Sequence, residues 1–350
     1  LALRGERDEP GQPSLHQRLP VDERLCVRHR PYRDRDREIQ LVTMRATARR
    51  PAFVAGAGGP RRLRPLFHDP SMPKKNLVYI QSLRNGAADR AGQPVAYQGG
   101  TRYMKAPLEY LVERLNDSSL GERYTLKGVI VDDDDGSPAD RAKVADYGFA
   151  RTPGRPWILP EGLTVQGRPV DDLFCTIAST YRRLPRDARE RVAGKQAFER
   201  RLLERLLELD ADVVVLDGLL VILDELVRPG ARFHRRIANI HPGITADGSP
   251  YQRRGAWATL DALHGARGER VDWSNGMTSS VEPVMMTGAS FHYVDNGIDS
   301  GEVICDVLDT PIAPDDTILE LRWNNFQRSL FPALERGLHV LADRHDAGAL

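Results

Sequence analysis

The chain has 350 residues, of which 41% are hydrophobic and 28% charged, a composition typical of globular proteins with one large or two ordinary domains. Its formal net charge of +1 gives no indication of a nucleic acid or an acidic membrane as partner. The three cysteines form no CxxC pair, which argues against a disulfide framework or a cysteine zinc site. No apolar run reaches the roughly 20 residues of a membrane helix, and no secretory signal is evident, so we expect a cytoplasmic protein without a membrane partner.

Residues 1–71 differ from the rest of the chain, because they hold 15 arginines, no lysine and nine acidic residues. Prolines and the alternating Arg/Asp run 33–37 interrupt any regular period, so we predict a disordered or non-native extension. An over-extended reading frame would also explain it, since Met72 precedes the first orderly segment. A basic arm for nucleic acid or a targeting peptide is the alternative, and the interleaved acids argue against both. We expect the functional domain to span 72–350.

From residue 76 onward, apolar runs alternate with segments of helical spacing. Strands are predicted over 76–80, 126–131, 212–217, 236–240, 289–294 and 303–308. Helices are predicted over 107–115, 197–209, 219–226 and 316–341, the last with a kink or break at Pro332. This alternation predicts an α/β fold with a mostly parallel sheet. Sites in such sheets form beyond the carboxyl ends of the strands, so the informative loops are 82–90, 217–221, 239–256 and 294–302.

The densest chemical signal is Asn239-Ile-His241-Pro242-Gly, directly after a short predicted strand. Residues two apart in an extended segment point to the same side, so the carboxamide of Asn239 and the imidazole of His241 should project together. Both can donate hydrogen bonds to an oxygen that becomes negative, and the imidazole can also move a proton. Taken alone, this tetrapeptide could equally be a loop histidine beside a turn asparagine.

The second signal is a predicted strand from Ala289 through His292, a turn with two acids, and a returning strand. Asp299 lies at the tip of that turn, between two glycines that permit unusual backbone angles. A carboxylate beside a histidine orients the ring and favours its charged form. An ordinary Asp/Gly hairpin turn is the alternative reading.

In order and spacing, the two segments resemble the formyltransferases that use 10-formyltetrahydrofolate. That family has an Asn-x-His-Pro segment, followed by a strand containing a histidine and a turn that ends Asp-small-Gly. The resemblance covers about 76–345 and implies a Rossmann-like fold, 10-formyltetrahydrofolate as co-substrate, a small-molecule acceptor and no metal. It places Asn239, His241 and Asp299 at the three catalytic positions, and His292 at the histidine of the second segment.

The same resemblance implies further binding residues. The pterin of the folate would lie against the backbone of two stretches: Leu216, Asp217, Gly218, Leu219 and Leu220, and Val294, Asp295, Asn296, Gly297 and Ile298. The acceptor side would be formed by Arg84, Asn85, Gly86 and Arg254. On the residues alone, the stretch around Gly218 could equally be an ordinary strand-to-helix turn.

Several departures from the family pattern bear on the acceptor. Gly243 replaces a small hydroxyl residue, and 267–287 looks like an insertion that either packs or lines an acceptor pocket. With the opening segment 76–90, these features resemble most the N5-hydroxyornithine formyltransferases of hydroxamate siderophore biosynthesis, of the pyoverdine and ornibactin type. The alternatives are another amine acceptor (glycinamide ribonucleotide, an amino sugar or methionyl-tRNA), a formyltetrahydrofolate hydrolase, or a non-catalytic folate-binding module.

The acidic run 132–135 is the one other candidate for a site. It could bind a divalent cation, but no partner carboxylates or histidines stand at a recognised spacing. We therefore expect a solvated loop after a strand.

Overall fold

A computed structural model describes residues 73–146, 160, 162–219 and 221–348. The predicted extension 1–71 lies outside the described residues. Contacts within the chain define two compact units, of which the larger comprises His68–Arg270 and Ser279–Leu350. Of the smaller unit, only Val271–Thr278 is described, at the tip of the hairpin formed by β10 (Glu269–Asp272) and β11 (Met277–Ser280). This hairpin belongs to the predicted insertion 267–287.

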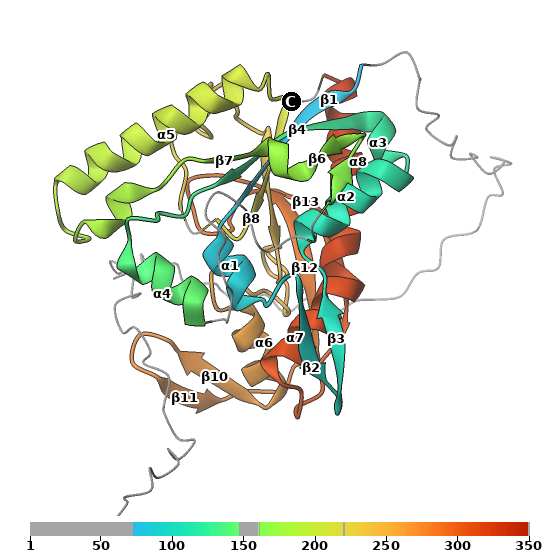
Figure 1. The fold of residues 1–350 in the computed structure, drawn as a ribbon. Coiled ribbons are helices and arrows are strands. Elements are labelled where there is room, and N and C mark those ends of the chain that lie inside the picture. Colours follow the sequence, from blue (N-terminus) through green and yellow to red (C-terminus); the bar gives the residue numbers. More distant parts are fainter. Residues whose placement is uncertain (1–72, 147–159, 161, 220, 349–350) are drawn as a thin grey trace, which may run out of the picture. The chain divides into compact units, whose positions relative to one another are not determined.

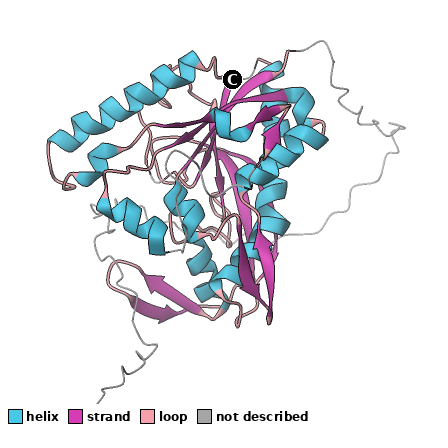
Figure 2. Ribbon diagram, in the orientation of Figure 1, coloured by secondary structure: helices cyan, strands magenta, loops and turns pink. Residues whose placement is uncertain are grey.

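The larger unit contains a seven-stranded sheet flanked by helices (Figures 1 and 2). Across the sheet, the strands are β13 (Val303–Pro311), β12 (Met286–Tyr293), β9 (Ile237–His241), β8 (Val213–Asp217), β1 (Lys75–Gln81), β4 (Tyr124–Val131) and β7 (Phe174–Thr176). The five strands from β9 to β7 are parallel, and β12 runs antiparallel to both of its neighbours. The predicted α/β fold with a mostly parallel sheet is confirmed, together with all six predicted strands.

The principal helices are α1 (Leu83–Ala88), α2 (Pro107–Asp117), α4 (Pro138–Asp146), α5 (Glu190–Glu208), α6 (Ala258–Ala266), α7 (Ile318–Asn325) and α8 (Phe331–Asp346). A short hairpin of β2 (Gln93–Tyr97) and β3 (Gly100–Met104) precedes α2. Among the described residues, no helix combines the length and apolar character needed to cross a bilayer.

Alternate residues along β1 bury against opposite layers of helices. Leu77 and Tyr79 belong to the core formed with α2 and α8, whereas Val78 and Ile80 pack with α5 on the other face. This division follows from the twofold side-chain period of a strand, and it makes β1 apolar on both faces. We call these the α8 face and the α5 face of the sheet.

Two predictions of local structure need correction. The segment 82–86, predicted as a polar loop, begins the short helix α1, because the distant Asp133 carboxylate accepts hydrogen bonds from the first N–H groups of that helix, those of Leu83 (2.6 Å) and Arg84 (3.2 Å). Among the described residues of 219–226 there is no helix, and the buried Glu199 carboxylate accepts hydrogen bonds from the N–H groups of residues 224 and 225.

The predicted C-terminal helix 316–341 is confirmed as α7 and α8, with the break that was predicted at Pro332. A π-helical turn, Phe326–Leu330, separates α7 from α8 directly before Pro332. Proline has no N–H for the preceding turn, and this wider turn accommodates it.

Candidate active site

Strand β9 positions two of the three predicted catalytic residues. Ile237 packs on the α5 face, while Ala238 and Ile240 pack on the α8 face. Asn239 and His241 therefore point toward the α5 face together, as their spacing predicted. His292 of β12 pairs with Asn239 across the sheet, so its side chain leaves the same face.

Asp299 joins this group from a turn that starts at the other end of β9. Because β12 is antiparallel to β9, the turn 294–302 starts beside the amino end of β9, not at the carboxyl edge with the other three loops. The turn folds back along β9, and Asp299 adopts a left-handed backbone conformation with φ +46°.

The three side chains lie within polar contact of one another. Asp299 Oδ1 accepts a hydrogen bond from Asn239 Nδ2 at 3.2 Å, and its Oδ2 lies 3.4 Å from His241 Nδ1. The backbone N–H of Gly255 donates to the same Oδ2 at 2.8 Å. Two turns and one strand end thus meet at one carboxylate.

His292 belongs to the same cluster, although sequence reasoning gave it a family position without a role. Its Nδ1 lies 2.8 Å from the carbonyl oxygen of Tyr293, and only a protonated nitrogen can bond to a carbonyl. Its Nε2 lies 3.3 Å from Asn239 Nδ2 and 3.5 Å from Asp299 Oδ1. His292 could have been assigned to the site from its pairing with Asn239 across the sheet, but the sequence alone does not show which residues pair.

The electrostatics of the cluster keep Asp299 ionised. Burial alone would raise the pKa of Asp299, but His292, His241 and the Gly255 N–H together hold that pKa well below its ordinary range. Burial lowers the pKa of His241, and the Asp299 carboxylate opposes this shift. The result is a fixed negative charge beside an imidazole that can gain or lose a proton.

The second ring nitrogen of His241 also faces an acceptor. Its Nε2 lies 2.9 Å from the carbonyl oxygen of Arg253, a residue that no sequence signal singled out. With Asp299 at Nδ1, a proton on either nitrogen has an acceptor. The ring can therefore pass between its neutral and charged forms without losing its position. This combination of amide donor, imidazole and carboxylate fits a carbonyl oxygen that becomes negative during acyl transfer.

No family model matches this sequence, and a search of curated proteins finds no match. Among solved structures, the chain is similar to PvdF of pyoverdin biosynthesis, described as a structurally unique N10-formyltetrahydrofolate-dependent formyltransferase. The two are 62% identical over 77% of this chain and 100% of the other, with a TM-score of 0.72. The chain belongs to the N10-formyltetrahydrofolate-dependent formyltransferases.

Structures of phosphoribosylglycinamide formyltransferase match at lower similarity. The protein from Bacillus halodurans is 20% identical over 77% of this chain and 97% of its own, with a TM-score of 0.44. The protein from Anaplasma phagocytophilum is 16% identical over 77% and 88%, with a TM-score of 0.42.

As a member of this family, the chain is an enzyme that transfers a formyl group and uses 10-formyltetrahydrofolate. Of the residues predicted to hold that donor, Leu216 is buried and Leu219 is partly buried, while Leu220 lies outside the described residues. Gly218 has φ +63°, and a Cβ there would stand 2.1 Å from Asn85 Nδ2. Helix α1, which bears Asn85 and Gly86, therefore packs directly on the end of β8.

The second predicted folate stretch forms the turn before Asp299. Asp295 Oδ1 accepts from the N–H of Gly297 at 3.0 Å and from Ser300 Oγ at 2.7 Å, which shapes the turn. Val294 donates its N–H to Ile237 O at 2.9 Å. Asn296 and Ile298 are exposed, so the turn offers both backbone and an apolar side chain to a ligand. Their roles in folate binding stay predictions.

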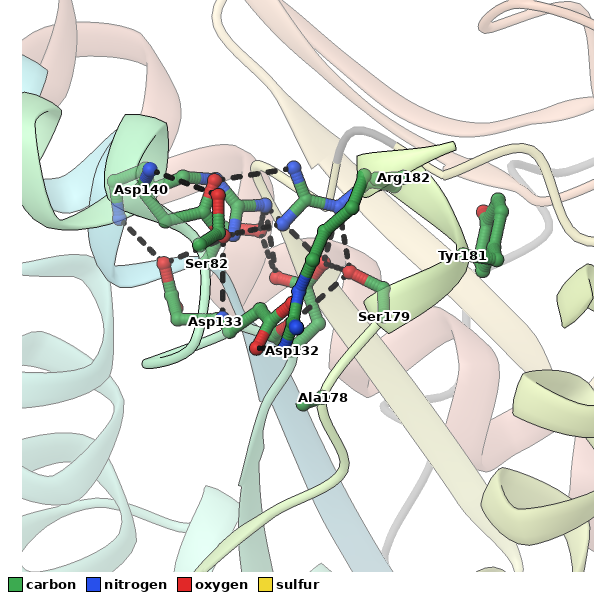
Figure 3. A network of polar contacts seen from close by, with 12 residues as sticks. Ser82, Asp132, Asp133, Asp140, Ala178, Ser179, Tyr181 and Arg182 are labelled. Carbon is green, nitrogen blue, oxygen red and sulfur yellow. Dashed lines mark hydrogen bonds and ion pairs between the residues drawn. The ribbon is translucent and has the colours of Figure 1, made fainter. Parts of the chain in front are cut away.

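Arg84, predicted on the acceptor side, is 5% exposed and lies in a network of charged groups. Figure 3 shows other members of this network, among them Asp132, Asp133, Asp140 and Arg182. Its guanidinium contacts Asp132 at 3.1 Å, Asp133 at 3.0 Å and Asp140 at 2.9 Å. The acidic run is therefore not a solvated loop: Asp132, Asp133 and Asp134 are 1%, 3% and 3% exposed. The expectation failed because the arginines that neutralise the run come from distant segments, among them Arg84, Arg182 and Arg183.

Arg254 also makes its contacts within the protein. Its Nη2 donates to Thr245 O at 2.6 Å and contacts Asp247 Oδ1 at 2.9 Å. These bonds fix the loop after His241, and the predicted substrate contact of Arg254 is not tested by them. Among the residues that the structure describes, no group of three His, Cys, Asp or Glu side chains could hold a metal ion.

Proposed function

We propose that this enzyme transfers the formyl group of 10-formyltetrahydrofolate to the hydroxylamine nitrogen of N5-hydroxyornithine, a step of hydroxamate siderophore biosynthesis. The carrying observation is the 62% identity to PvdF, a formyltransferase of pyoverdin biosynthesis, over the whole of that chain. The polar cluster at the end of β9 supports the chemistry, because it supplies the donors and the proton carrier that formyl transfer needs. We further propose that residues 72–350 form the catalytic domain.

Asn239, His241 and Asp299 divide the work in this proposal. The acceptor nitrogen must be neutral, because its lone pair forms the new bond to the formyl carbon while the bond from that carbon to folate N10 breaks. Asn239 donates a hydrogen bond to the formyl oxygen as it gains negative charge, and protonated His241 donates a second one through Nε2, which must leave Arg253 O to do so. Asp299 holds His241 and stabilises its charged form. The proton lost by the acceptor nitrogen balances the one gained at N10.

A hydroxylamine suits this site because it is weakly basic and stays neutral at physiological pH. A primary amine would first have to lose a proton, and the cluster contains one fixed carboxylate, Asp299, which already engages two side chains. The acceptor side thus needs no strong base.

The test is a panel of acceptors mixed with the enzyme and 10-formyltetrahydrofolate, with release of tetrahydrofolate as the readout. The panel contains N5-hydroxyornithine, ornithine, glycinamide ribonucleotide, an amino sugar, methionyl-tRNA and a mixture without acceptor. We expect release with N5-hydroxyornithine at a rate at least about tenfold above the other mixtures, since an acceptor lacking a needed group binds poorly. Equal release without acceptor would indicate a hydrolase, and preferred release with another amine would replace the proposed acceptor.

A further inference from the structure

A second polar group lies at the carboxyl ends of β1 and β8, on the α8 face of the sheet. Tyr79 is part of the core on that face, and its hydroxyl donates to Asp217 Oδ2 at 2.8 Å. Gln81 lies two residues after Tyr79 on β1 and pairs with Asp217 across the strands, so it leaves the same face. The site formed by Asn239 and His241 does not use these side chains.

Two donors in this region have no acceptor among the described residues. Gln81 is 3% exposed, and its Nε2 makes no hydrogen bond. Arg322 of α7 pairs through Nη1 with Asp89, while its Nε is buried without a partner. Arg322 is linked to this region through Asp89, whose carboxylate also acts on Asp217. Burying an unpaired donor is unfavourable, so these two donors indicate a missing acceptor. The Arg84 network offers a contrast, because its carboxylates and guanidinium groups bond one another.

Two carboxyl groups lie beside these donors. Burial, with the nearby Asp89 carboxylate, raises the pKa of Asp217 to about 7, against the opposing effect of the Tyr79 hydroxyl. Burial also raises the pKa of Asp89, which Arg322 opposes. Two acids that disfavour each other's charge would both be stabilised by a cation placed near them. The region thus presents unused donors for an anion and adjacent acids for a cation.

We propose that Gln81 and Arg322 bind the carboxylate, and Asp217 with Asp89 binds the ammonium, of an α-amino-acid head on the acceptor. This subsite rests on the proposed function and extends it to the far end of the acceptor. A zwitterionic α-amino acid carries a carboxylate for the donors and an ammonium for the acids on the same carbon.

The distance to the catalytic group fits a short tether. Asp217 and His241 are the last residues of the adjacent parallel strands β8 and β9, which lie roughly 4.8 Å apart by ordinary sheet spacing. Their side chains leave opposite faces, and beyond the strand ends a ligand can reach both. Three methylene groups between the α-carbon and the reacting nitrogen span roughly 5 Å when extended, by standard bond lengths. Asp217 pairs with Ile240, one residue before His241, so the backbone spacing is a lower limit for the distance that the acceptor must span.

The experiment compares three hydroxylamines on the full-length enzyme at saturating 10-formyltetrahydrofolate. These are N5-hydroxyornithine, 5-(hydroxyamino)pentanoate, which lacks the ammonium, and N-hydroxy-1,4-diaminobutane, which lacks the carboxylate. We expect the wild-type kcat/KM to fall about tenfold or more for each truncated acceptor, the usual effect of losing a charged hydrogen-bond partner. This comparison needs no variant and so does not depend on the folding of one.

Two variants then assign the contacts. Asp217→Asn should bring the kcat/KM ratio of N5-hydroxyornithine to 5-(hydroxyamino)pentanoate near one, and Gln81→Leu should do the same for the ratio to N-hydroxy-1,4-diaminobutane. Gln93→Leu is the matched control, because Gln93 Nε2 is also buried without a partner, on β2. It should leave both ratios at the wild-type value.

The outcomes separate the two proposals. If wild type formylates all three hydroxylamines equally, or if each variant lowers all three rates in parallel, the subsite is refuted while the proposed function stands. If wild type formylates none of them but accepts another amine, the proposed function fails and the subsite with it.

Discussion

The carboxylate of Asp299 lies 3.4 Å from Nδ1 of His241, although the turn that carries Asp299 starts beside the amino end of β9 and His241 stands at its carboxyl end. The approach depends on the antiparallel β12, which carries the turn to the amino end of β9 before it folds back. One acid thereby contacts both side chains of the Asn-x-His segment.

The first prediction concerns that contact. His241→Ala and Asp299→Asn should each lower kcat by about two orders of magnitude or more, as removal of an oxyanion donor or its support usually does. Thermal melting should show that both variants remain folded. Turnover within a few fold of wild type in either purified variant would refute the roles assigned to them.

The second prediction concerns pH and the buried carboxyl of Asp217. Its pKa of about 7 in the folded protein exceeds the ordinary value of 3.8, so the folded state binds more protons between these values than the unfolded state does. This contribution to stability is present at acid pH and is lost as the pH rises through about 7. Asp217→Asn should therefore become more stable relative to wild type between pH 4 and pH 8, by at most about 4 kcal/mol. Urea unfolding at several pH values measures this difference, and a constant difference would contradict the assignment.

The third prediction concerns the Arg84 network. Arg84→Met would leave Asp132, Asp133 and Asp140 without a main counterion in a buried setting. We expect the free energy of unfolding to fall by about 3–5 kcal/mol. Arg205→Ala is the control, because Arg205 pairs with Glu208 near the surface and should change stability by about 1 kcal/mol at most. Denaturant titration decides this, and equal effects of the two changes would show that the network is dispensable.

The fourth prediction separates backbone strain from contact at Gly218. Gly218→Ala and Gly248→Ala both place a side chain at positive φ, which costs about 1–2 kcal/mol. The new Cβ meets Asn85 in the first case and nothing within 4 Å in the second. Only Gly218→Ala should therefore raise the KM of the substrates, because it displaces helix α1. Unchanged kinetics in Gly218→Ala, with stability lowered as in Gly248→Ala, would show that α1 does not contact a substrate.

The sequence predicted the strands well, because each is apolar on both faces or alternates clearly, as in β1 and β8. It also predicted Asn239 and His241 on one face, since that follows from the twofold period alone. The sequence did not predict that β12 runs antiparallel to β9, because strand direction depends on the connections between strands and not on the local residue pattern. The resemblance therefore predicted that Asp299 belongs to the site. It did not predict that the turn carrying Asp299 folds back along β9.

The failures share one cause, which is pairing between segments far apart in the chain. The acids 132–134 look solvated until Arg84, Arg182 and Arg183 are placed beside them. The start of α1 looks like a loop until Asp133 accepts its first N–H groups. His292 and the carbonyl of Arg253 enter the site through tertiary contacts that leave no local pattern.

The positive φ of Asp299 has a consequence for saturation mutagenesis at this position. Asparagine and glycine tolerate such a conformation, whereas valine, isoleucine and threonine do not. A library of all substitutions would rank these residues by chain geometry as well as by charge. A glycine variant would show the effect of losing the carboxylate without distorting the backbone. The β-branched variants would show the loss of the carboxylate and the backbone distortion together.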